Sequence, residues 1–160
     1  MGFISNLFAR AEPALTEATS GDAAAISALH GASFRRGWNE QEVETLLTDR
    51  HVLAHRAMTG SKMAGFIMSR LVEDEAEILT VAVARESRRR GVGRALLEEA
   101  MRHAYREGAE RMYLEVEDTN RAAIALYRWA EFHETGRRAG YYREGRTAPG
   151  GALVMLRQLR

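Results

Sequence analysis

Apolar runs of two kinds alternate along this chain and predict a mixed fold. Short β-branched or alternating runs predict strands over residues 14–18, 51–58, 63–71, 75–83, 111–117, 132–142 and 152–159. Apolar residues recurring every three or four positions predict helices over 23–34, 40–49, 91–107 and 121–130. We therefore expect a single-domain α/β (α+β) fold, with about four helices and a mixed, mostly antiparallel sheet of about six or seven strands.

Turn and cap residues support these boundaries. Asp22 is expected to cap the first helix, and Asn39 with Glu42 forms a capping-box pattern for the second. Thr59 to Lys62 predicts a hairpin turn, and Gly108 is expected just past the third helix.

The third helix should connect two parallel strands by a right-handed crossover, which places the parallel step in the middle of the sheet. The last two predicted strands should close the sheet as an antiparallel pair, joined by a loop over residues 143–151.

The turn before the third helix combines glycines with basic residues. Gly91 and Gly93 stand at the mouth of the helix, where backbone N–H groups and the helix dipole can bind phosphate. Arg88, Arg89, Arg90 and Arg94 add positive charge. An ordinary strand-to-helix turn with a solvated basic face is the alternative. The pattern is not a dinucleotide fingerprint, because Leu96 replaces its third glycine.

Two residues could supply acid–base chemistry. Glu115 lies in a strand that we expect to be buried on both faces, where a carboxylate needs either a partner or a catalytic task. An ion pair with an arginine is the structural alternative. Tyr127 lies on the apolar face of the last helix and could equally be a core aromatic residue.

Three motifs together resemble the GCN5-related N-acetyltransferases (GNAT), and within them the RimI-type enzymes that acetylate the N-terminal alanine of a ribosomal protein. They are R-x-x-G-x-G at 88–93, L-E-V at 114–116 and N-x-x-A-x-x-L-Y at 120–127. The resemblance implies acetyl-CoA as cosubstrate, Glu115 as general base through water and Tyr127 as general acid toward the coenzyme A sulfur.

The resemblance also implies where ligands bind. The backbone of Val81, Ala82 and Val83 would pair with the pantetheine arm, and residues 89–94 (including Val92) would hold the pyrophosphate. Arg88 and Asn120 would also contact the cofactor. Tyr141 and Tyr142 would border the peptide groove, although a hairpin aromatic pair is the alternative.

Phe34 and Trp38 would line the substrate side of the same groove. Relatives often carry Pro-Trp where Gly37-Trp38 stands here, so the resemblance specifies the substrate less closely than the cofactor. Relatives also carry Gly where Glu131 stands, so the helix exit is expected to differ in shape.

Composition excludes several other classes. The chain has 160 residues and a net charge of +1, so direct nucleic-acid binding is not expected. It has no cysteine, which fits a reducing cytoplasm. No membrane span is expected, and no metal site, because His51 and His55 lack a third ligand. Residues 1–12 are expected to be an extension preceding a domain of residues 13–160.

Three functions remain open. The first is acetylation of the N-terminal α-amine of a protein, possibly a ribosomal protein. The second is acetylation of a small-molecule amine or a protein lysine. The third is a non-catalytic acyl-CoA-binding module, which retention of both Glu115 and Tyr127 argues against.

Overall fold

The computed structural model describes residues 12–139, 142–143, 146–147 and 150–160. Its helices are α1 (Ala23–Ser33), α2 (Glu40–Thr48), α3 (Val92–Arg106) and α4 (Arg121–Trp129), with short 3-10 turns η1 (Ser20–Asp22) and η2 (Arg85–Ser87). In the described part of the chain, no helix has the length and apolarity that a membrane crossing requires.

One seven-stranded sheet organises the molecule. Its strands, in spatial order, are β1 (Ala14–Glu17), β2 (Val52–Thr59), β3 (Lys62–Val72), β4 (Glu75–Val83), β5 (Arg111–Glu117), β9 (Ala152–Gln158) and β6 (His133–Arg138). A separate two-stranded sheet joins β7 (Tyr142–Arg143) to β8 (Arg146–Thr147). The β4–β5 pair is parallel and every other neighbouring pair is antiparallel, so the predicted mixed sheet is confirmed.

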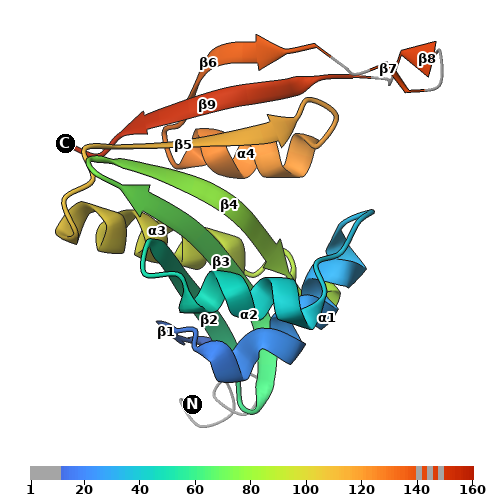
Figure 1. The fold of residues 1–160 in the computed structure, drawn as a ribbon, viewed down its shortest axis with the longest axis vertical. Helices are drawn as coiled ribbons and strands as arrows, with labels where there is room; N and C mark the ends of the chain where they lie inside the picture. Colours follow the sequence, from blue (N-terminus) through green and yellow to red (C-terminus); the bar gives the residue numbers. More distant parts are fainter. Residues whose placement is uncertain (1–11, 140–141, 144–145, 148–149) are drawn as a thin grey trace, which may run out of the picture.

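Helices cover the two faces of the sheet unequally. Helices α1 and α2 lie on one face of β2–β4, where Ile26 and Val43 pack with Phe66 and Met68. Helices α3 and α4 lie on the opposite face, and a larger core there includes Leu96 and Leu114 (Figure 1). Among the described residues, the half of the sheet formed by β5, β9 and β6 is covered by a helix on one face only.

Strands β4 and β5 separate soon after they begin. Their parallel pairing joins only residues 75–77 to residues 111–113, and Figure 1 shows the strands diverging beyond that point. A bulge at Leu79 shifts the register of β4 against β3. Ile78 and Val81 consequently pack on the α3 side, whereas Leu79 and Ala82 pack on the α1–α2 side.

Cap predictions are confirmed in two cases and wrong in one. Asn39 and Glu42 form the reciprocal capping box at α2. Gly108 follows α3 with φ of +102°, the left-handed conformation that glycine adopts most easily. Asp22 occupies the N-cap position of α1, but its carboxylate does not cap that helix. The carboxylate instead accepts the Thr19 N–H and pairs with the Arg56 guanidinium.

Candidate active site

Among the strands that the structure describes, none pairs with the edge of β4 that faces the gap toward β5. In the described residues, β4 is paired beyond Glu77 only with β3, so the polar groups on its other edge face the gap. Near the end of that edge, the Arg88 Nε donates a hydrogen bond to the Val83 carbonyl at 3.2 Å. An extended ligand could therefore pair with the predicted residues Val81, Ala82 and Val83 as an added strand.

The N-terminus of α3 lies beside the end of this edge. Gly91 is its N-cap residue with φ of +81°, and no side chain of the described residues caps the helix. Arg89 also has a positive φ, +63°, so the turn contains two residues in left-handed backbone conformations. The first-turn N–H groups of this fifteen-residue helix, with the positive end of its dipole, form the kind of site that binds phosphate.

Gly93 shows how closely three elements meet there. A Cβ atom placed on Gly93 would lie 3.4 Å from a Leu126 methyl carbon and 3.7 Å from a Val83 methyl carbon. The first turn of α3, the end of β4 and the middle of α4 therefore converge at one point.

The predicted arginines have different surroundings. The Arg94 guanidinium lies over the Trp129 ring, 4.6 Å from its centroid, in a cation–π contact. Arg90 lines a cavity of about 490 Å³ together with Lys62 and Val92. A role in holding pyrophosphate stays a prediction for residues 89–94.

Glu115 is exposed, which corrects the expectation that its strand is buried on both faces. Its side chain is 40% exposed, and its Oε1 lies 2.8 Å from a guanidinium nitrogen of Arg138. Leu114 and Val116 point into the core toward α4, so the residue between them points to the uncovered face. The arginine ion pair is therefore present, and it is compatible with a catalytic task because the carboxylate is open to solvent.

Tyr127 is buried on the other side of β5. It is 6% exposed and packs in the same core as Leu114 and Val116, with its ring in an edge contact 5.9 Å from Phe132. Burial raises the pKa of the Tyr127 phenol to about 12, so the phenol is protonated at neutral pH. Glu115 and Tyr127 thus lie on opposite faces of one strand beside the gap.

The remaining residues predicted to bind cofactor or substrate are Asn120, two aromatic residues after α1 and a tyrosine pair. The Asn120 Oδ1 accepts the Ala123 N–H at 3.2 Å and caps α4. Phe34 is 39% exposed, whereas Trp38 is half-buried and stacks on the His30 ring at 4.2 Å. Tyr141 lies outside the described residues, and Tyr142 begins β7.

His30 was missed by sequence reasoning. It is 4% exposed, and its Nδ1 accepts the Trp38 backbone N–H at 3.1 Å, which holds the loop against α1. The signal was available, because His30 follows Ile26 by four residues on the apolar face of that helix.

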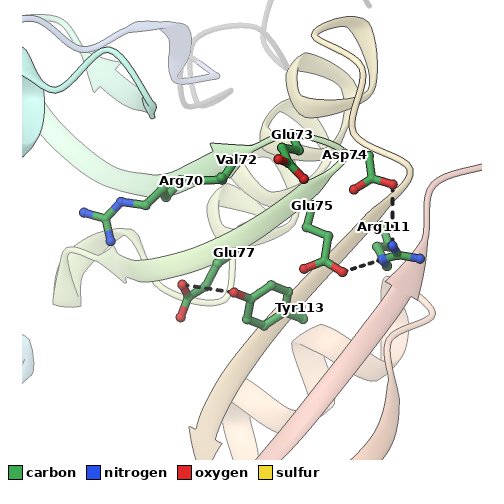
Figure 2. A pocket seen from close by; sticks show the side chains of 8 residues that line it. All are labelled: Arg70, Val72, Glu73, Asp74, Glu75, Glu77, Arg111 and Tyr113. Carbon is green, nitrogen blue, oxygen red and sulfur yellow. Dashed lines mark hydrogen bonds and ion pairs between the residues drawn. The ribbon is translucent and has the colours of Figure 1, made fainter.

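A second cavity, of about 470 Å³, lies at the other end of β4 and β5, where the strands pair (Figure 2). Arg111 pairs with Asp74 and Glu75 there, and the lining as a whole carries four carboxylates against two arginines. The Tyr113 hydroxyl lies 3.4 Å from the Glu77 carboxylate. In the part of the chain that the structure describes, no group of three or more metal-ligating side chains is found.

Comparison with known proteins identifies the family of the chain. Residues 23–132 match the model of the Acetyltransferase (GNAT) family. The chain is 36% identical over 105 residues to the [ribosomal protein bS18]-alanine N-acetyltransferase of Escherichia coli K12, covering 66% of this chain and 70% of that protein. It is 38% identical over 91 residues to the N-alpha-acetyltransferase RimI of Mycobacterium tuberculosis, covering 54% and 56%.

The fold agrees with the same assignment. The crystal structure of the ribosomal-protein-S18-alanine N-acetyltransferase from Escherichia coli superposes with a TM-score of 0.83 at 28% identity, over 92% of this chain and 94% of that one. Acetyl-CoA is the cosubstrate of the family. The chain therefore belongs to the GNAT family and is an N-acetyltransferase.

Proposed function

We propose that this enzyme acetylates the N-terminal α-amine of a protein, most favourably an N-terminal alanine, with Glu115 as general base and Tyr127 as general acid. The observation that carries the proposal is the placement of a solvent-accessible carboxylate and a buried phenol on opposite faces of β5, beside the gap. Relatives named as alanine and N-alpha-acetyltransferases support the acceptor.

Three features of the gap fit acetyl-CoA. The free edge of β4 offers backbone groups to an amide-containing arm, and the uncapped start of α3 offers N–H groups to phosphate. A Cβ atom placed on Gly91 would meet no other described atom within 4 Å, so the turn leaves space for a ligand. Bound there, acetyl-CoA supplies the acetyl thioester.

Glu115 and Tyr127 then divide the proton transfers. Glu115 accepts the proton of the attacking amine through water, and a new N–C bond replaces the C–S bond. Tyr127 donates a hydrogen bond to the departing sulfur. Because the Tyr127 pKa of about 12 exceeds the value of about 8.5 for an ordinary thiol, full proton transfer to the sulfur is uphill. The phenol therefore stabilises the departing thiolate chiefly through that hydrogen bond.

Acid–base arithmetic favours an α-amine over lysine as acceptor. An α-amine has a pKa of about 7.7–8.0 against about 10.4 for lysine. At pH 7.5 roughly a quarter to two-fifths of α-amines are neutral, compared with about a thousandth of lysines. A single carboxylate acting through water therefore has the easier task with an α-amine.

The test uses a peptide that begins with alanine and carries an internal lysine. After incubation with enzyme and acetyl-CoA, fragmentation mass spectrometry should place the acetyl group on the N-terminus. Label on the lysine alone, or on added spermidine alone, would overturn the proposed acceptor. Binding of acetyl-CoA without turnover of any amine would favour the non-catalytic module.

A further inference from the structure

We infer that Arg138 is a specificity-determining residue, which positions the Glu115 carboxylate and disfavours acceptors that arrive as ammonium ions. The inference rests on the proposed function of Glu115. It arises from the 2.8 Å ion pair between the two side chains, which links the end of β6 to the uncovered face of β5.

Strand register explains how the pair forms across an intervening strand. Arg138 lies opposite Ala152 of β9, and Ala152 in turn lies opposite Glu117 of β5. Glu115 is two residues from Glu117 and faces the same side of the sheet. The small Ala152 side chain leaves room for the arginine to cross β9 and reach Glu115 diagonally.

The pair fixes a side chain that is otherwise mobile. An exposed glutamate on a strand samples several rotamers, and holding its Oε1 on a guanidinium restricts them. Oε2, the other oxygen of the carboxylate, remains the atom that can take up the proton of an amine through water. Arg138 acts through Glu115 in this respect, as a positioning residue.

The charge of Arg138 also discriminates between acceptors. Glu115 and Glu117 are both exposed on this face, so without Arg138 the acceptor side of β5 would carry two carboxylates and attract cations. A guanidinium within ion-pair distance of the base repels an incoming ammonium. Lysine and polyamine nitrogens approach as ammonium ions, whereas an α-amine is neutral in a large fraction of encounters.

Arg137 supplies a matched control one residue away. It lies opposite the buried Leu153, so its side chain is directed to the other face of the sheet, and it pairs with Asp118 and Glu134. Arg137→Gln removes the same charge from the same strand but not from the Glu115 face. Arg138→Lys keeps the charge while changing the geometry.

The experiment measures kcat/KM for two peptides of otherwise equal sequence, one with a free N-terminal alanine and one with a blocked N-terminus and a single lysine. Arg138→Gln should lower the preference for the α-amine on the order of tenfold, through a loss on the alanine peptide and a gain on the lysine peptide. Arg137→Gln should keep the wild-type preference. Arg138→Lys keeps the charge, so it should keep the low activity on the lysine peptide, but its changed geometry should lower kcat/KM on the alanine peptide.

A measurement on the wild type complements the variants. Raising the salt concentration should reduce the α-amine preference, because it screens an exposed charge such as Arg138. The inference about Arg138 would be overturned by an unchanged preference in a folded Arg138→Gln enzyme, or by a wild-type preference that does not change with salt. Either result would leave the proposed function of Glu115 standing. A wild type that acetylates neither peptide would instead refute the proposed function.

Discussion

Glu115 and Tyr127 carry the proposed chemistry, and the sequence predicted the surroundings of Tyr127 better than those of Glu115. Tyr127 is buried in the core, as helical spacing indicated, and burial raises its pKa to about 12. Glu115 is exposed and paired, although its neighbours are buried. A run such as Leu114-Glu115-Val116 does not tell whether a second layer covers the outer face of its strand, because that depends on elements distant in sequence.

At this scale we predict that Glu115→Gln and Tyr127→Phe each lower kcat by about 10²–10⁴-fold while acetyl-CoA binding is kept. Each variant preserves shape and removes only an acid–base group. The control is Tyr105→Phe on the exposed surface of α3. Steady-state kinetics and calorimetry measure the two effects. Near-normal turnover in Glu115→Gln would leave that carboxylate with only its ion pair to Arg138.

The helices and strands could be predicted from the sequence, but the order of the strands in the sheet could not. The capping box at Asn39 and the glycine after α3 set element boundaries through contacts within a few residues. The insertion of β9 between β5 and β6 depends on pairings between distant segments, and so does the Leu79 bulge in β4. The early separation of β4 and β5, which opens the site, therefore had no local sequence signal.

The start of α3 gives a prediction at the scale of an element. Gly93→Glu should weaken acetyl-CoA binding at least about tenfold, because it places a negative charge where helix N–H groups and dipole would hold phosphate. The same glutamate should also lower stability, because its side chain would begin 3.4 Å from a Leu126 methyl carbon and 3.7 Å from a Val83 methyl carbon, where a carboxylate loses water. Calorimetry and thermal unfolding separate the two effects.

Gly93→Ala is the control for that substitution. A methyl group at Gly93 would contact Leu126 at 3.4 Å, a flexible side chain that can shift by a few tenths of an ångström. If Gly93→Ala and Gly93→Glu bound acetyl-CoA equally well, the phosphates would have to lie away from the start of α3.

Two buried histidines make the stability of the whole molecule depend on pH. Burial lowers the pKa of His30 from its usual value, with a smaller opposing effect of Glu42. Burial and the nearby His103 lower the pKa of His55, whose Nε2 lies 2.9 Å from the His103 Nδ1. Protonation would also abolish the bond in which His30 accepts the Trp38 N–H.

The direction in which stability changes with pH follows from the number of protons that the folded and unfolded states bind. Near and below the unfolded histidine pKa of about 6.5, the unfolded chain binds more protons than the folded one, so stability rises with pH. The contribution of each histidine is complete above that value and is lost as the pH falls. We therefore predict that the free energy of unfolding, measured with urea, falls between pH 7 and pH 5, by at most about 1.4 kcal/mol per pH unit for each histidine.

Variants assign this dependence to particular side chains. His30→Gln and His55→Gln should each flatten the fall in unfolding free energy between pH 7 and pH 5, whatever they do to stability at pH 7.5, because each removes one group that takes up a proton on unfolding. His51→Gln removes an exposed histidine and should keep the wild-type curve. If the wild-type free energy of unfolding did not change between pH 7 and pH 5, both buried rings would have to accept protons as readily in the folded protein as in the unfolded chain. Activity measured over the same pH series would tell the two histidines apart. Protonation of His30 should affect activity, because His30 holds the loop beside the proposed acceptor groove. His55 on β2 contacts His103 on α3 instead.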